Sequence, residues 1–284
     1  MVNRRNFIKT TSAFTAGSLI IPPFSFSKRK IIGLQLYTVR DQLNQDLDGT
    51  LKRVAEIGYN SLEAAGYNIS DGTFYGIKPK EFARKLKGLG MRLNSSHTAF
   101  EPDVADKVLS DTITAGCKYI VYPHLAEEMR RNIDDYRAVA GKLNKLGEAA
   151  KKHGILFGYH NHNFEFQDMG GQIGMDVLLA ETDPSLVLFE IDLYWVISAG
   201  YDPVDYMKKH PGRFKLWHIK DMTKTDDKFF APVGTGRIDF ERIFAIKELS
   251  GMEMFFVEQD QFKNMGAFDG IKTSYDYLNN AAWV

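Results

Sequence analysis

The sequence predicts a single α/β barrel in which eight parallel strands alternate with eight helices. Short apolar, β-branched runs alternate along the chain with longer amphipathic segments, and glycines stand where those segments end. Parallel neighbours in a sheet need crossover connections, usually helices, so this alternation favours a parallel sheet. Residues 31–284 also have the length of one (β/α)8 barrel, roughly 250 residues. With eight such units the sheet can close, and we expect one domain.

The predicted strands are runs of four to seven residues rich in Ile, Leu, Val, Phe and Tyr. In chain order they are Ile31–Tyr37, Ser61–Ala64, Arg92–Ser96, Tyr119–Tyr122, Ile155–His160, Leu186–Ile191, Phe214–Ile219 and Glu253–Val257. The predicted helices are the amphipathic segments that follow them: Thr50–Ile57, Pro79–Leu89, Val104–Ala115, Ile133–His153, Gly174–Glu181, Pro203–Lys209, Phe240–Leu249 and Ala267–Asn279. Five of these helices are followed by a glycine shortly before the next strand, where a glycine commonly ends a helix: Gly58, Gly90, Gly116, Gly154 and Gly251.

The first 30 residues have the order of an export signal rather than of a folded element. Arg4-Arg5-Asn6-Phe7-Ile8-Lys9 resembles the twin-arginine motif, and a mild apolar stretch and Pro22-Pro23 follow it. The apolar stretch is too short and too rich in Thr, Ser and Gly to span a bilayer. We therefore expect residues 1–30 to be a twin-arginine signal and linker, and residues 31–284 to be a periplasmic barrel without a stable membrane anchor after export. A basic cytoplasmic tail is the alternative.

The composition of the chain excludes some classes of binding partner and site. The chain is 44% hydrophobic and 25% charged, as globular proteins are, and its 36 Lys and Arg balance 36 Asp and Glu. A neutral chain without a basic block is poorly suited to nucleic acid, so no nucleic-acid partner is expected. Cys117 is the only cysteine, which excludes an internal disulfide and a cysteine-rich metal site. The composition is compatible with either a monomer or a homo-oligomer.

Histidines and carboxylates gather where the predicted strands end. In a barrel of this kind the active site lies at the C-terminal ends of the strands. Five of the seven histidines occupy such positions: His97, His124, His160, His162 and His218. Imidazole nitrogens and carboxylate oxygens together form a ligand set for a divalent transition metal. We favour His160, Asp192, His218 and Glu258, one from each of four successive strands, with His162 and Glu165 as competing ligands.

The sequence resembles the xylose-isomerase-like barrel family of sugar isomerases and epimerases. The resemblance rests on Tyr159-His160-Asn161-His162, Ile191-Asp192, His218-Ile219-Lys220-Asp221 and Val257-Glu258. It implies one divalent metal, manganese first with zinc, cobalt and iron as alternatives, held by one residue from each of strands five to eight. Those positions are His160, Asp192, His218 and Glu258. The epimerases of the family carry a glutamate where His160 stands, and they use it with the strand-eight glutamate as two opposed bases.

The resemblance predicts a metal-dependent sugar isomerase or epimerase acting on a keto-sugar or keto-glycoside. A metal that polarises a carbonyl stabilises the charge left when the neighbouring carbon loses its proton. Glu258 is the expected base, and His97, His162 and Lys220 are candidates to supply a proton. Elimination of a β-substituent, as a lyase or dehydratase, is the alternative, because His160 removes one of the two carboxylates. A third hypothesis is an exported sugar-binding protein without catalysis.

Several residues are candidates for contact with a small carbohydrate substrate. Gln35 and Glu63 suit sugar hydroxyls, His124 lies at a strand end, and Tyr37 and Trp195 could pack on a sugar ring. For the aromatic residues, packing at the barrel rim is an equal alternative. The glycine-rich residues 233–237 could bind a phosphate or simply shape their loop, and the second interpretation is favoured. Residues 170–174 lack the spacing of a dinucleotide fingerprint.

Overall fold

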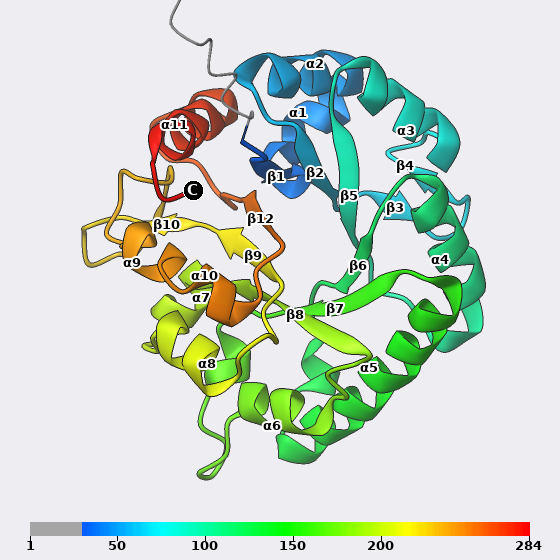
Figure 1. Cartoon of the computed structure of the whole chain (residues 1–284), viewed down its shortest axis with the longest axis vertical. Helices are drawn as coiled ribbons and strands as arrows, with labels where there is room; N and C mark the ends of the chain where they lie inside the picture. Colours follow the sequence, from blue (N-terminus) through cyan, green and yellow to red (C-terminus); the bar gives the residue numbers. More distant parts are fainter. Residues whose placement is uncertain (1–29) are drawn as a thin grey trace, which may run out of the picture.

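The computed structural model describes residues 30–284, and within them eight parallel strands close into a barrel (Figure 1). The barrel strands are β1 (Gly33–Gln35), β2 (Ser61–Ala64), β5 (Arg92–His97), β6 (Tyr119–Tyr122), β7 (Leu156–His160), β8 (Val187–Asp192), β9 (Leu216–Ile219) and β12 (Met254–Val257). Pairing of β12 with β1, in which Gly33 lies opposite Phe256, joins the last strand to the first. The predicted fold class is therefore confirmed.

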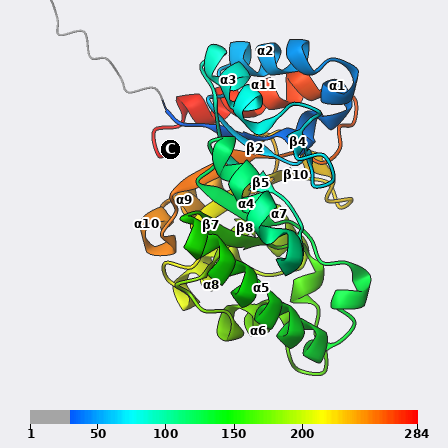
Figure 2. The ribbon, with the colours of Figure 1, turned by 90° about the vertical axis from the view of Figure 1, so that its right-hand side faces the viewer.

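Helices surround the barrel, with α11 near the C-terminus beside α2 near the N-terminus (Figures 1 and 2). The α-helices are α1 (Arg40–Gln45), α2 (Leu47–Ile57), α3 (Pro79–Gly88), α4 (Ala105–Thr114), α5 (Ile133–His153), α6 (Gly174–Glu181), α7 (Leu193–Ser198), α8 (Pro203–Lys209), α9 (Phe240–Phe244), α10 (Lys247–Ser250) and α11 (Ala267–Asn280). Short 3₁₀ turns occupy Leu36–Val39, Pro102–Val104, Glu127–Met129 and Phe164–Phe166. Gly154 and Gly251 end α5 and α10 in the left-handed conformation, which a residue with a Cβ adopts at a cost.

The structure differs from the expected elements mainly at the C-terminal ends of the strands. The predicted segment Phe240–Leu249 is two helices, α9 and α10, because the backbone leaves the helical region at Ile246. Two short helices, α1 and α7, were not predicted. Two hairpins were also missed: β3 (Tyr67–Asn68) with β4 (Thr73–Phe74), and β10 (Asp221–Met222) with β11 (Phe230–Ala231). All four additions follow a barrel strand directly or within a few residues.

The interior of the barrel changes from apolar to polar along its axis. Side chains alternate between the two faces of a strand, so residues two apart share a face. Leu188, Glu190 and Asp192 therefore share one face of β8, and Leu216 and His218 share one face of β9. Leu188 and Leu216 belong to a small buried apolar cluster with Tyr119, Val121 and Phe256. The polar residues follow this cluster toward the C-terminal ends of the strands.

The larger apolar core lies between strands and helices and includes Phe82, Tyr136, Leu143, Trp217 and Phe244. None of the helices within residues 30–284 is both long enough and apolar enough to cross a membrane. The predicted export signal around Arg4 and Arg5 lies outside the described residues.

Candidate metal centre and its cavity

Four side chains of the metal-ligating kind meet at the C-terminal ends of four neighbouring strands. His160 ends β7, Asp192 ends β8, His218 lies in β9, and Glu258 follows β12. One nitrogen or oxygen atom from each lies within 4.8 Å of the others, and all four residues are buried. We call these four residues the upper group. It contains the four residues that the sequence predicts as ligands.

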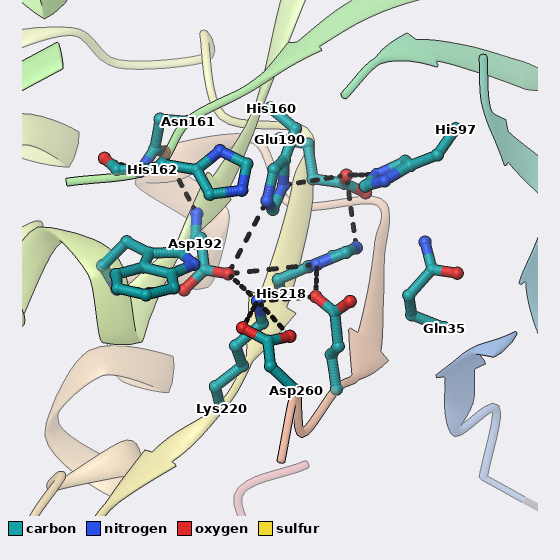
Figure 3. Close-up of polar contacts among 12 residues, drawn as sticks. Gln35, His97, His160, Asn161, His162, Glu190, Asp192, His218, Lys220 and Asp260 are labelled. Carbon is teal, nitrogen blue, oxygen red and sulfur yellow. Dashed lines mark hydrogen bonds and ion pairs between the residues drawn. The ribbon is translucent and has the colours of Figure 1, made fainter. Parts of the chain in front are cut away.

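Local structure orients Asp192 toward the other three residues. Its Oδ1 accepts a hydrogen bond from the backbone N–H of Trp195 (3.0 Å) and so caps the N-terminus of α7. Asn161 accepts a hydrogen bond from the Asp192 backbone N–H. The other oxygen, Oδ2, lies 3.7 Å from His160 Nε2 and 4.0 Å from His218 Nδ1 (Figure 3). Capping therefore fixes one oxygen and leaves the second facing the two imidazoles.

Lys220, directly after β9, brings a cation beside the upper group. Its Nζ lies 3.0 Å from Asp192 Oδ2, 2.8 Å from Glu258 Oε2 and 3.0 Å from Asp260 Oδ1. Burial alone would lower the pKa of Lys220, but the three carboxylates raise the pKa well above its usual range. Burial also opposes ionisation of Glu258, yet Lys220 and His218 hold the pKa of Glu258 below its usual range. The cavity wall therefore carries an ammonium group against the ionised carboxylate of Glu258.

A second polar group lies deeper in the barrel. Glu190 Oε2 is 2.5 Å from His97 Nε2 and 3.2 Å from both His160 Nδ1 and His218 Nε2 (Figure 3). Glu63 Oε2 is 2.5 Å from His218 Nε2. Burial raises the pKa of Glu190 to about 7 and also raises the pKa of Glu63, although the neighbouring histidines oppose both shifts. We call His97, Glu63 and Glu190 the lower group.

Gln35 and Glu63 lie beneath the cavity rather than on its wall. Both side chains are fully buried. Gln35 Nε2 donates to Glu63 Oε2 (2.8 Å), and Gln35 Oε1 accepts from the backbone N–H of Tyr37 (3.0 Å). The sequence predicts that both residues bind sugar hydroxyls, but neither lines the cavity. Gln35 is hydrogen-bonded to Glu63, and Glu63 in turn contacts His218.

The upper group opens into a cavity of about 440 Å³. Its walls include most of the residues that the sequence predicts for catalysis and substrate binding: Tyr37, His97, His124, His162, Lys220 and Glu258, together with Arg40, Asp260 and Gln261. Tyr37 is 44% exposed, and the Arg40 guanidinium stacks on its ring at 4.1 Å. Trp195 is absent from this wall and instead packs against the ring of His162. Sequence reasoning assigned no role to Asp260 or Glu190, although strand alternation places both on inward faces.

His162 and Glu165 do not belong to the group of converging ligand atoms. The buried Glu165 carboxylate accepts from Tyr159 Oη and from the backbone N–H of His162. It therefore fixes the segment after β7. The His162 ring stacks on Phe164 with centroids 5.4 Å apart and faces the cavity, and burial lowers the pKa of His162 to about 2. His162 is thus a neutral imidazole on the wall.

The glycine-rich loop after β9 is organised by a carboxylate of this chain. Asp221 is buried and accepts hydrogen bonds from the backbone N–H groups of Gly234, Gly236 and Ile238. A Cβ at Gly236 would lie 2.2 Å from Asp221 Oδ1, so the close approach requires glycine. The amides that a phosphate would need are therefore already bound to Asp221, which agrees with the loop-shaping interpretation.

The upper group fits a divalent cation by both its chemistry and its geometry. Two imidazole nitrogens and two carboxylate oxygens match the ligands of zinc and related metals. Asp192 Oδ2 is buried and accepts no hydrogen bond of good geometry from any residue in the described part of the chain. Metal bonds of roughly 2.0–2.2 Å place tetrahedral ligands about 3.3 Å apart. The Asp192 distances of 3.7 and 4.0 Å are near that spacing, whereas the 2.6 Å contact of His218 Nδ1 with Glu258 would have to open.

Comparison of sequences places these observations among known proteins. A family model described as xylose isomerase-like TIM barrel matches residues 51–279. An inosose dehydratase of Geobacillus kaustophilus is 24% identical over 294 residues, which cover 89% of each protein. An inosose dehydratase of Clostridium perfringens is 31% identical over 147 residues, or 46% of this chain, and the match spans about half the length of that relative.

Solved structures extend the comparison. A sugar phosphate isomerase/epimerase from Parabacteroides distasonis superposes with a TM-score of 0.83 at 32% identity, covering 92% of this chain and 97% of that one. Two further structures share the fold at lower identity. The zinc-bound IolI protein is 15% identical with a TM-score of 0.67, over 88% of this chain and 96% of that one. The 3-keto-D-glucoside 4-epimerase of E. coli is 16% identical with a TM-score of 0.66, over 89% and 100%.

Proposed function

The chain belongs to the xylose isomerase-like TIM barrel family, and we propose that it is a divalent-metal-dependent sugar isomerase or epimerase. Its substrate is a keto-sugar or keto-glycoside, and the reaction begins with removal of a proton next to the carbonyl group. The observation that carries the proposal is the convergence of His160, Asp192, His218 and Glu258 within 4.8 Å beside a cavity of about 440 Å³. A cavity of that size can enclose a small sugar.

The upper group would hold the cation, with manganese first and zinc supported by the zinc-bound neighbour of the same fold. When bound, a divalent cation supplies Lewis-acid stabilisation of the negative charge that develops on the carbonyl oxygen. The Glu258 carboxylate lines the cavity and is the base that takes the proton from carbon. Lys220 can donate a hydrogen bond to a substrate oxygen, because its ammonium lies on the same wall.

We assign proton transfer at a second position of the substrate to His162. It enters the cavity from the end of β7, whereas Glu258 follows β12. A neutral imidazole can accept a proton on its free nitrogen, so His162 can take a proton at a second position and then return it to carbon or oxygen in place of the missing glutamate. His97 also lines the cavity, but its Nε2 is 2.5 Å from Glu190 and is engaged in the lower group.

Sugar contacts in this proposal come from the rim of the cavity. The exposed ring of Tyr37, held by Arg40, offers an apolar face for a sugar ring, and His124 and Asp260 offer hydrogen-bonding atoms. Trp195 supports His162 from behind. Because Asp221 already binds the loop amides of Gly234 and Gly236, we propose an unphosphorylated substrate.

Elimination is the second candidate reaction, and the similarity to inosose dehydratases favours it. The same proton removal by Glu258 precedes loss of a β-substituent, and His162 or Lys220 would then protonate the leaving group. His160 also favours elimination, since it replaces a carboxylate that a two-base epimerase would use. The two reactions share their first step and diverge only after the proton has left the carbon.

The test is incubation of the metal-loaded protein with keto-sugars and 3-keto-glycosides in deuterated water, followed by NMR. Deuterium at the carbon next to the carbonyl, with a new stereoisomer or an aldose–ketose change, supports the proposed reaction. Deuterium uptake with loss of a substituent supports elimination instead. Binding without exchange, shown by line broadening of the sugar signals only, would contradict catalysis and indicate a sugar-binding protein.

A further inference from the structure

His160 and His218 of the upper group also contact the lower group, because each histidine turns opposite ring nitrogens toward the two groups. His218 Nδ1 lies 2.6 Å from Glu258, and its Nε2 lies 2.5 Å from Glu63. His160 Nε2 lies 3.7 Å from Asp192, and its Nδ1 lies 3.2 Å from Glu190. A second set of converging ligand atoms, from His97, His160, Glu190 and His218, therefore lies directly beneath the first.

Two cations cannot fill both groups without unusual chemistry. A neutral imidazole carries a lone pair on one nitrogen and a proton on the other. If each group held a cation, His160 and His218 would each bind metal through both ring nitrogens. Each ring would then have to lose its last proton. The structure therefore calls for one cation and a proton on the opposite nitrogen of each shared histidine.

The lower group has the shorter contacts, apart from the 2.6 Å contact of His218 Nδ1 with Glu258 in the upper group. Glu190 Oε2 lies 2.5–3.2 Å from three imidazole nitrogens, and Glu63 Oε2 lies 2.5–3.2 Å from two. These separations are shorter than the roughly 3.3 Å between ligands of a tetrahedral metal, and the 2.5 Å contacts of Glu190 with His97 and of Glu63 with His218 are hydrogen bonds. The carboxylates Glu63 and Glu190 of the lower group are fully buried, whereas Glu258 of the upper group lines the cavity. The upper group therefore presents a carboxylate to a cation in the cavity, and the lower group presents only the imidazole of His97.

We propose that Glu63 is a positioning residue that fixes the tautomer of His218. Glu63 accepts the proton on His218 Nε2, so that the Nδ1 lone pair faces the cation. Gln35 holds Glu63 in place through its 2.8 Å hydrogen bond, and the Tyr37 backbone N–H holds Gln35. A carboxylate behind a ligating histidine fixes its ring and strengthens its basicity. The proposal rests on the cation site of the proposed function.

The substitution Glu63→Gln tests the proposal in the full-length protein loaded with zinc. Glutamine keeps the shape and one acceptor oxygen but removes the charge. We expect zinc affinity, measured by competition with a chromophoric chelator, to fall by roughly 10–100-fold. Glu165→Gln is the matched control: Glu165 is also a fully buried glutamate of this barrel, and its hydrogen bonds go to Tyr159 and the His162 backbone. Its affinity should stay within about twofold of wild type.

Nitrogen-15 NMR of the histidine rings gives a readout that a purely structural role would not change. In zinc-loaded wild type we expect His218 with zinc on Nδ1 and a proton on Nε2. Zinc on Nε2 would overturn the inference, because the cation would then occupy the lower group. Unchanged zinc affinity in Glu63→Gln, with the same His218 tautomer, would also overturn it. If wild type binds no divalent cation at all, the proposed function fails instead, and the outcomes are therefore distinguishable.

Discussion

His160 sets the charge of the upper group and limits the proton chemistry around it. With Asp192 and Glu258 as the two carboxylates, the group carries two negative charges, which a divalent cation neutralises in full. The epimerases that the sequence resembles carry a glutamate at this position. The imidazole shifts the ligand set toward nitrogen, which suits zinc and iron better than magnesium. It also leaves the second proton transfer to a neighbouring residue such as His162.

Asp192→Asn separates cation binding from helix capping. The amide retains an oxygen that can accept from the Trp195 N–H and cap α7, but it removes the charge that faces His160 and His218. We expect affinity for a divalent cation to fall by more than about 100-fold, since even the partners of metal ligands are worth roughly 10–100-fold. Elemental analysis after equilibrium dialysis measures the bound metal.

Asp202→Asn provides the control for that substitution. Asp202 caps α8 through the Val204 N–H, just as Asp192 caps α7, but it lies outside the upper group. It should bind metal as wild type does. Full metal occupancy in Asp192→Asn would remove Asp192 from the ligand set, and His162, which lines the same cavity, would then be considered in its place.

At the scale of elements, alternation along the strands explains how much of the site could be predicted. The strand ends at His160, Asp192 and Glu258 follow from apolar runs that are legible in the sequence, so the upper group could be predicted. The lower group depends on contacts across the barrel. Glu63 and His218 are 155 residues apart, and no local pattern shows that their side chains meet. Gln35 and Glu63 were therefore expected to bind sugar, although they lie beneath the cavity.

The additions at the strand ends were missed for a related reason. Helices α1 and α7 have only six residues each, too few to show a helical period. Asp192 caps α7, but an aspartate at the end of a strand looks the same whether it caps a helix, binds a metal or does both. The hairpin of β10 and β11 is only two residues long on each side. Such elements depend on tertiary contacts rather than on local propensity.

Side-chain contacts of Glu253 link the N-terminal ends of β6, β9 and β12. These contacts should make the stability of the protein depend on pH. Glu253, just before β12, is bonded by Lys118, Tyr119 and Lys215, which stand at the starts of β6 and β9. Burial would raise the pKa of Glu253, but these hydrogen bonds lower the pKa to about 2. The folded-state pKa is thus below the unfolded value of about 4.3, so the stabilisation is complete above that pH and is lost as the pH falls toward 2.

Glu253→Gln should remove this part of the acid sensitivity. The carboxylate is 32% exposed, so solvent screening limits the loss at neutral pH to about 1 kcal/mol. We expect the melting temperature of the variant, followed by circular dichroism, to be below wild type at pH 7 and to approach it near pH 2. Glu248→Gln, at an exposed carboxylate on α10, is the control. Parallel curves for wild type and Glu253→Gln would contradict the assignment.

At the scale of the whole molecule, closure of the barrel creates the site. The upper group draws on β7, β8, β9 and β12, and the lower group adds β2 and β5 from the other side of the ring. Neither group exists in a chain whose sheet is still open. Metal binding by the upper group would therefore stabilise the closed barrel, because the unfolded chain offers no assembled site.

The N-terminal sequence bears on the cellular compartment in which the folded barrel functions. Twin-arginine export carries proteins that are already folded, which suits a protein that acquires its metal before it leaves the cytoplasm. We propose that Arg4 and Arg5 direct the chain to the periplasm. Replacing both with lysine should retain the protein in the cytoplasm, as measured by fractionation and immunoblotting. Equal periplasmic amounts of wild type and the double variant would rule out this route.

The proposed reaction depends on proton removal by Glu258 beside a bound cation, and the substitution Glu258→Gln isolates that step. The substitution keeps an oxygen that can bind the cation and removes the basic carboxylate. The measurement is deuterium incorporation from solvent into the substrate carbon, divided by the metal content of the same sample. We expect a fall of roughly 10²- to 10⁴-fold, the usual contribution of a general base. If the metal remains and deuterium enters at the wild-type rate, Glu258 is not the base, and His162 or His97 must take that role.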